Sequence, residues 1–81
     1  YDAIEKEEAL HDVEMLIDIL PMDQRRIVMM RYYQDLSFKQ IAELEGISIN
    51  TALGRMRYAL INLRKYAEKY DLVRDLEKVF D

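Results

Sequence analysis

The chain has 81 residues, enough for one small domain with a modest core. It contains no cysteine, which excludes disulfide bonds and zinc–thiolate sites, and its two glycines and single proline favour helices over strands. The net charge of −4 is uneven: residues 1–24 carry −7, residues 25–69 carry +5 and residues 70–81 carry −2. A basic middle suits a polyanion on one face; a solvated surface of mixed charge is the alternative.

Membrane and secretory segments are not expected from this sequence. No apolar stretch approaches the roughly 18–20 residues of a membrane span. Residues 1–10 are acidic and polar, unlike a signal peptide. We therefore expect a soluble cytoplasmic domain without a membrane partner.

Residues 3–19 are predicted to form the first helix. Its apolar residues recur at three- and four-residue spacing, with acids on the other side: Leu10, Val13, Leu16, Ile17 and Leu20. Pro21 interrupts this pattern and suits the first turn of a second helix, where Asp23 complements the helix dipole.

The second predicted helix, residues 22–34, is apolar in nearly all directions around its axis. The residues concerned are Ile27, Val28, Met29, Met30, Tyr32 and Tyr33. A helix of this kind is either wholly buried or touches a partner. Because so short a chain buries little completely, we expect Met29 and Tyr32 to face a partner, with ordinary core packing as the alternative for each.

The stretch "SFKQIAELEGIS" predicts a short helix and a tight turn. Ser37 and Gln40 form a capping-box pattern, so the helix should begin at Phe38, with Ile41, Ala42 and Leu44 on its buried side. Gly46 ends it, and Ser48 caps the next helix. Two helices joined in this way make a helix-turn-helix, which binds DNA in some proteins and forms plain bundles in others.

Residues 49–65 fit one helix with two contrasting sides. The apolar stripe predicted to pack on the earlier helices contains Ile49, Ala52, Leu53, Met56, Ala59, Leu60 and Leu63. The other side and its shoulders contain Asn50, Thr51, Gly54, Arg55, Arg57, Tyr58, Ile61 and Lys65. No acid occurs from Ile49 to Ala67, so this side suits the major groove of DNA.

Gly54 lies inside this helix, where glycine costs about 1 kcal/mol relative to alanine. Our interpretation is that the missing Cβ lets the helix sit closer to base edges or phosphates. The alternative is a tolerated surface residue without a role.

These motifs resemble region 4 of the sigma-70 superfamily, nearest to the extracytoplasmic-function group. The resemblance covers about residues 13–66. It rests on Leu20-Pro21, Arg26, "RYY" at 31–33, "LSFKQIA" at 36–42, "GIS" at 46–48, Thr51, Arg55 and a basic "LRK" that ends at Lys65. It implies an all-α bundle of four helices with a helix-turn-helix, to which the sequence adds a C-terminal amphipathic helix.

By this resemblance the chain binds the −35 element of double-stranded promoter DNA and docks on the β flap of RNA polymerase core. It also admits an anti-sigma factor as a partner. Lys39 falls where the family's first helix meets phosphate. The recognition-helix positions that meet DNA are Asn50, Thr51, Leu53, Gly54, Arg57 and Tyr58, to which the chemistry of its side chain adds Arg55.

The sequence departs from the usual family pattern at two informative positions. Glu45 stands in a normally apolar position and Leu53 in a basic one. The family's region 2, which melts promoters, has no counterpart here. We therefore expect residues 1–81 to be one region 4-like domain, a C-terminal fragment of a longer sigma factor.

Two other functions remain open at this point. One is an autonomous helix-turn-helix regulator of the response-regulator type. The other is a helical protein-interaction module without DNA binding, which the acidic first helix and Glu45 favour.

An enzyme is not expected, and neither a cofactor nor a metal is implied. His11, the single histidine, has Glu7 and Glu14 at helical spacing, but a surface histidine among acids fits better than a metal site.

The tail "DLVRDLEKVF" predicts a fifth amphipathic helix. Asp71 either caps it or lies in a continuation of the preceding helix, and we expect it to contact Ile61, Tyr66 or a neighbouring chain or domain.

Overall fold

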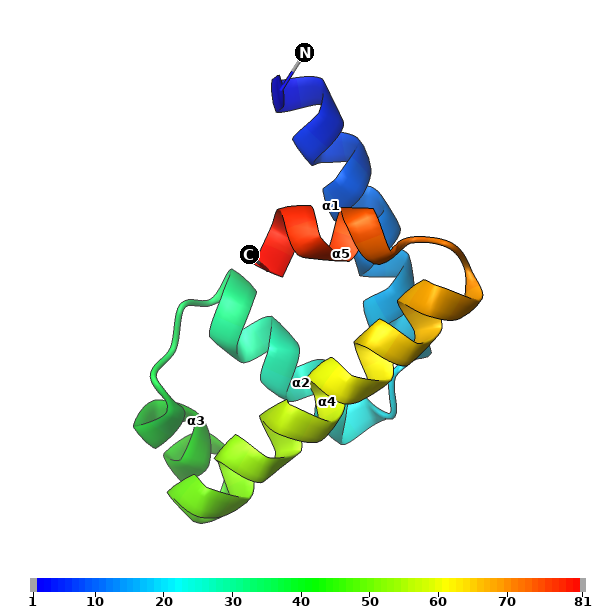
Figure 1. Cartoon of the computed structure of the whole chain (residues 1–81). Helices are drawn as coiled ribbons and strands as arrows, with labels where there is room; N and C mark the ends of the chain where they lie inside the picture. The colour runs from blue at the N-terminus through cyan, green and yellow to red at the C-terminus, as the bar shows by residue number, and fades with distance from the viewer. Residues whose placement is uncertain (1, 81) are drawn as a thin grey trace. The chain divides into compact units, whose positions relative to one another are not determined.

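A computed structural model describes residues 2–80, and the side chains of residues 3–80. The described residues form five α-helices and one π-helical turn, without a strand, so the all-α prediction is confirmed. In chain order these are α1 (Asp2–Ile19), α2 (Met22–Val28), the π-helical turn η1 (Met29–Tyr33), α3 (Phe38–Glu45), α4 (Ile49–Lys69) and α5 (Val73–Phe80) (Figure 1). In this part of the chain, no helix combines the length and apolarity needed to cross a membrane.

The chain divides into two compact units. The first contains the residues up to Leu20 and those from Ile61 onward, and the second contains Pro21–Leu60. The helix α4 contributes its N-terminal part to the second unit and its C-terminal part to the first.

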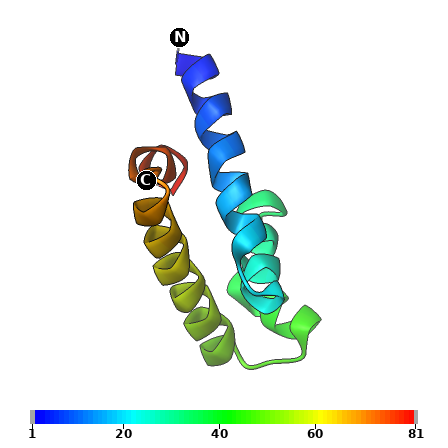
Figure 2. The same ribbon diagram turned by 90° about the vertical axis from the view of Figure 1, so that its right-hand side faces the viewer.

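In the first unit α5 packs on α1, and the two helices lie side by side in both ribbon views (Figures 1 and 2). Burial follows the predicted stripe of α1 with one exception: Leu10 is partly exposed, whereas Ala9 is buried. The buried apolar residues that this unit contributes are Ala9, Val13, Leu16, Ile17, Leu20, Leu63, Ala67 and Leu76.

The turn between α4 and α5 is made by Asp71 in the left-handed conformation, with φ of 59°. The backbone N–H of Leu72 donates to the carbonyl of Ala67 over 2.7 Å, the bond of a Schellman motif that ends α4. Asp71 therefore terminates α4, and α5 is a separate helix that begins at Val73. The structure shows α5 packed on α1, and the expected contact with Ile61, Tyr66 or a neighbouring chain or domain stays a prediction.

A pair of carboxyl groups joins α1 to α5. Burial, a hydrogen bond with Asp12 and the negative charge of Asp12 together raise the pKa of Asp75, and Lys78 opposes the shift only in part. Because the pKa of Asp75 is raised, there is a pH range above 3.8 in which the folded chain still holds a proton on Asp75 and the unfolded chain has released it. This contribution to stability is therefore full at acid pH, below the ordinary value of 3.8, and is lost as the pH rises through the raised pKa.

Asp75→Asn is expected to stabilise the chain near pH 7 and to flatten its pH dependence above about pH 4. The amide still donates to Asp12 but never ionises, so the repulsion between the two carboxylates disappears. Thermal melts between pH 4 and 7 measure the effect. Glu77→Gln, which removes an exposed carboxylate from the same helix, is the control, and an equal response of both variants would contradict the assignment.

The second unit begins with α2, which Pro21 starts in an extended conformation (ψ 150°). Proline suits this place because its missing N–H has no partner at a helix start. The N–H of Arg25 donates to the carbonyl of Pro21 over 2.9 Å and closes the first turn, which also holds Asp23.

After Val28 the predicted single helix widens into the π-helical turn η1. The N–H of Gln34 donates to the carbonyl of Met29, five residues back, over 3.1 Å. Arg31 contacts the loop that follows η1 and the start of α3. Its Nη1 donates to the carbonyl of Leu36 over 3.0 Å, and its guanidinium lies 5.1 Å from the ring centre of Phe38. The helix predicted for residues 22–34 is therefore present from Met22 to Tyr33, but its second half is π-helical, which was not predicted.

The helix-turn-helix is formed by α3, the turn at Gly46 and the start of α4 (Figure 2). Both bonds of the predicted capping box are present: Ser37 Oγ accepts from the N–H of Gln40, and Gln40 Oε1 accepts from the N–H of Ser37. Gly46 adopts the left-handed conformation (φ 66°, ψ 36°) that ends α3. Ser48 Oγ accepts from the N–H of Thr51 over 3.0 Å and caps α4.

Burial in the second unit differs from the prediction on one side of α3. Leu44 was predicted to lie on the buried side but is 67% exposed. The reason is the shortness of α3, whose two turns present only a narrow strip to the rest of the unit. The buried apolar residues that this unit contributes are Ile27, Val28, Ile41, Ala42, Ala52, Met56 and Ala59.

An ion pair between α2 and the end of α3 accounts for the acid in a normally apolar position. Arg26 Nη2 lies 2.8 Å from Glu45 Oε2; the side chain of Glu45 is only 10% exposed and that of Arg26 55%. The carboxylate is nearly removed from water, so it depends on the guanidinium for compensation.

Arg26→Met is expected to destabilise the chain by about 1–2 kcal/mol, because it leaves a poorly hydrated carboxylate without its partner. Glu45→Leu should cost less, within about 0.5 kcal/mol, since the exposed arginine returns to water. Urea unfolding of both variants measures the asymmetry. Equal losses would show that the pair behaves as an ordinary surface ion pair.

Candidate nucleic-acid interface

The buried stripe of α4 is narrower than its apolar sequence pattern. Ala52, Met56, Ala59 and Leu63 are buried as predicted. Ile49, Leu53 and Leu60 are exposed, which corrects their assignment to the packed side. Leu53, also predicted to meet DNA, is therefore accessible.

The opposite side of α4 is open to solvent in the second unit. Asn50, Thr51, Arg57 and Tyr58 are all exposed, Tyr58 to 63%. The first turn of the helix contains no acid, and its N-terminal backbone N–H groups favour an anion such as phosphate. This surface combines amide, hydroxyl, guanidinium and phenol groups, the donors and acceptors that read base edges and phosphates.

Thr51 is oriented by the helix cap. The hydroxyl of Ser48 donates to Thr51 Oγ1 over 2.9 Å, while Ser48 Oγ accepts from the N–H of Thr51. The cap thus fixes the position of Thr51 Oγ1 at the start of α4.

Gly54 is not required by the fold of the chain. A Cβ built at this position meets no atom within 4 Å, and Gly54 has no positive φ. The cost of glycine in the helix is therefore not offset by packing within the chain. The interpretation that the missing side chain serves a partner therefore stays open, as does the alternative of a tolerated surface residue.

Arg55 differs from the other predicted DNA-binding residues. Its side chain is 24% exposed, and its Nε lies 3.6 Å from Oδ2 of Asp23 in α2. The two residues are far apart in the sequence, and no local pattern links them. Sequence reasoning missed this pair for that reason, as it missed the partner of Glu45.

Lys39 lies in the first turn of α3 and is exposed, so it is available to a phosphate. All eight residues predicted to bind DNA belong to the second unit. The structure therefore places Lys39 and the exposed side of α4 on the two helices of one helix-turn-helix.

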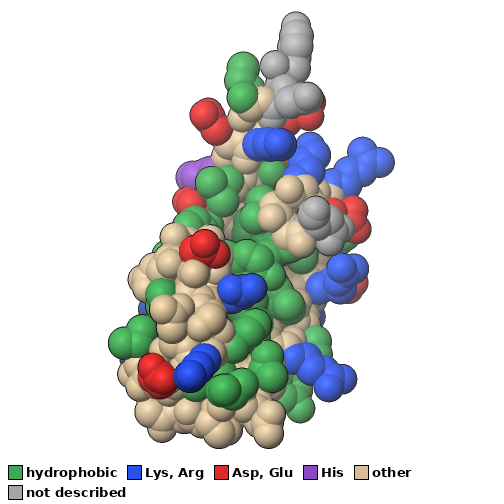
Figure 3. Space-filling view, turned by 90° about the vertical axis from the view of Figure 1, so that its left-hand side faces the viewer, with side chains coloured by type: hydrophobic (Ala, Val, Ile, Leu, Met, Phe, Trp, Pro, Cys, Tyr) green, Lys and Arg blue, Asp and Glu red, His purple; other side chains and the backbone are tan. Residues whose placement is uncertain are grey.

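The residues predicted to meet a protein partner lie in η1. Met29 and Tyr32 are 38% and 46% exposed, and Tyr33 is exposed beside them in sequence. Hydrophobic side chains also reach the surface elsewhere, as one face of the chain shows (Figure 3). The expected exposure of both residues is confirmed.

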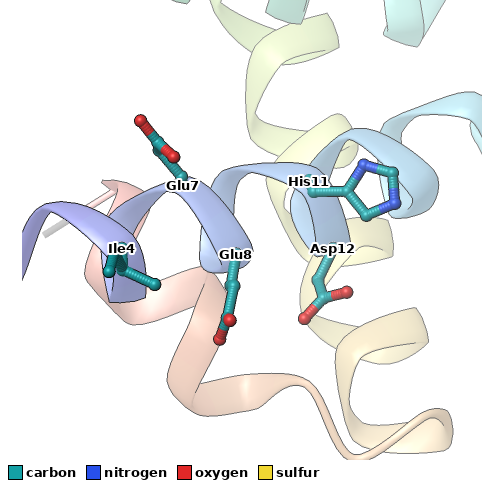
Figure 4. A pocket seen from close by; sticks show the side chains of 5 residues that line it. All are labelled: Ile4, Glu7, Glu8, His11 and Asp12. Atoms are coloured by element: carbon teal, nitrogen blue, oxygen red, sulfur yellow. The ribbon is translucent and has the colours of Figure 1, made fainter. Parts of the chain in front are cut away.

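The region around His11 forms a shallow hollow in the first unit, lined by Ile4, Glu7, Glu8, His11 and Asp12. Its side chains diverge: Glu8 and Asp12 point to one side, while Glu7 and His11 point elsewhere (Figure 4). Within the described residues, no group of three or more acidic or histidine side chains is arranged to hold a metal ion.

A capped short helix, a left-handed glycine turn and a second helix without an acid in its first turn form a helix-turn-helix domain. The family model described as "Sigma-70, region 4" matches residues 10–60. The chain belongs to this family.

A curated relative supports the same assignment. The chain is 34% identical over 61 residues to RNA polymerase sigma factor SigV of Bacillus subtilis (strain 168). The matched region is 75% of this chain but 37% of the relative, so the chain spans little more than a third of that protein. No solved structure matches the chain.

Proposed function

We propose that this chain binds the −35 element of promoters as region 4 of a sigma factor and so supports transcription initiation. The observation that carries the proposal is the exposed side of α4 around Asn50, Thr51, Arg57 and Tyr58, which is polar, basic and free of carboxylates. Lys39 on α3 adds a phosphate contact beside it. The family assignment supplies the kind of DNA.

Selection of duplexes from a random DNA library by the chain tests the proposal directly. We expect a preferred duplex, bound in a salt-dependent manner with a slope of log K against log salt of about −0.9 for each phosphate contacted. A shuffled duplex of equal length is the control. Absence of binding at low salt would instead support a protein-interaction module.

Gly54→Ala is expected to stabilise the free chain by about 1 kcal/mol, because alanine is the better helix former and its Cβ meets nothing within 4 Å. The affinity for the selected duplex should fall, since the methyl group separates the helix from the groove. Thermal melts and fluorescence titration measure the two effects. A stabilised variant with unchanged affinity would show that Gly54 has no role in binding.

The second part of the proposal concerns RNA polymerase. Met29 and Tyr32 expose apolar surface on η1, which suits an apolar contact with the β flap of the core enzyme. Double substitution of both residues by serine should weaken binding to the polymerase core in pull-down experiments while DNA binding by the chain is retained. Loss of both activities would point to misfolding instead.

A further inference from the structure

The ion pair between Asp23 and Arg55 joins the first turn of α2 to the second turn of α4. The carboxylate of Asp23 is held at both oxygens: Oδ1 accepts from the N–H of Gln24 over 3.0 Å, and Oδ2 faces Nε of Arg55 at 3.6 Å. The first contact is local to the helix start, so the ion pair with Arg55 is the contact that links Asp23 to another helix.

The ion pair with Asp23 involves the Nε edge of the Arg55 guanidinium. A guanidinium reads a guanine edge through two parallel N–H groups. Asp23 faces Nε, so this ion pair uses one edge of the guanidinium and does not involve the donors on the two Nη atoms. Gly54 next to Arg55 carries no side chain that would obstruct this approach.

The negative charge of Asp23 argues that this residue orients Arg55 and does not itself add to DNA affinity. Asp23 is acidic, so by itself it repels DNA and lowers the affinity for any duplex. A carboxylate 58% exposed beside the candidate interface is costly for binding unless it improves discrimination. A restrained arginine gains discrimination because it loses less conformational freedom when it meets the correct base.

We propose that Asp23 is a positioning residue that aims Arg55 at a base edge and so determines sequence specificity. This inference rests on the proposed DNA-binding function and deepens it. It assigns opposite effects to one carboxylate: Asp23 weakens binding to all DNA, and it raises the preference for the correct sequence.

The test compares the wild-type chain with Asp23→Asn on two duplexes: one selected from a random library by the wild-type chain, and its shuffled counterpart. We expect the variant to bind the shuffled duplex more tightly. The ratio of the two affinities should fall by about fivefold, the low end of the discrimination that one bidentate pair contributes. Asp23→Glu, which keeps the carboxylate, should retain a larger share of the wild-type affinity ratio than Asp23→Asn does.

Two matched controls separate positioning from charge and from folding. Glu43→Gln removes an exposed carboxylate from α3, so it should raise both affinities and leave their ratio unchanged. In an Arg55→Met background, Asp23→Asn should not change the ratio at all. The NMR signal of the Arg55 Nε–H should shift in Asp23→Asn, while the melting temperature stays near that of the wild type.

The possible results separate the positioning role of Asp23 from the proposed DNA-binding function. A wild-type chain with no preferred duplex would overturn both. A wild-type chain that discriminates, with an unchanged ratio in Asp23→Asn, would overturn the positioning role alone. A fall of the ratio that persists in the Arg55→Met background would also overturn it, because the effect would not pass through Arg55.

Discussion

Leu63→Ala is expected to lower the free energy of unfolding by about 2–5 kcal/mol, the range for truncating a buried leucine. Leu63 is fully buried on the packed stripe of α4, so alanine loses the transfer free energy and leaves a cavity. Small domains have total stabilities of about 5–15 kcal/mol, so this single change removes a large share. Urea unfolding monitored by circular dichroism measures it.

Leu53→Ala is the matched control for this prediction. It makes the same chemical change in the same helix, but Leu53 is 45% exposed, so the expected loss is within about 0.5 kcal/mol. If the two variants lost equal stability, the burial pattern of α4 described above would be wrong. A reduced DNA affinity of Leu53→Ala at unchanged stability would assign Leu53 to the interface.

The double variant Lys39→Ala/Arg57→Ala is expected to lose at least about a hundredfold in affinity for duplex DNA at low salt. Charge-assisted hydrogen bonds contribute about 1.5–3 kcal/mol each, and two separate sites add approximately. Both side chains are exposed on the candidate interface. The slope of log K against log salt should decrease by about two, because two phosphate-neutralising charges are absent.

Lys6→Ala/Arg74→Ala removes the same two residue types from exposed positions of the first unit and serves as the control. This control changes the net charge by the same amount, so it separates the effect of where the two charges lie from the effect of the total charge. Similar losses in both double variants would mean that binding depends on general electrostatics, and the assignment of Lys39 and Arg57 to a specific interface would fail.

Local features of this chain were predictable from sequence because their causes lie within a few residues. The capping box needs only Ser37 and Gln40, and the left-handed turn needs only a glycine after two helical turns. The cap of α4 by Ser48 is equally local. The family resemblance has the same basis, since it follows the order of such short motifs along the chain.

Patterns of helical periodicity predicted burial less well. A stripe drawn on an ideal helix assigns every apolar residue on one side to the core, but only the residues that meet a neighbour are covered. Leu44 and Leu53 fit the period and remain exposed, because α3 and α4 contact their neighbours along narrow strips. The π-helical turn at Met29 was likewise invisible to a pattern that assumes 3.6 residues per turn.

The sequence by itself determined the helical class, the caps and the glycine turn of the helix-turn-helix, and the family of this protein. Only the tertiary structure decided which charges meet: Arg26 with Glu45, Asp23 with Arg55, and Asp12 with Asp75. The physical reason is range. Caps and turns depend on backbone geometry over three to six residues, whereas an ion pair between helices depends on the path of the whole intervening chain, which no local pattern records.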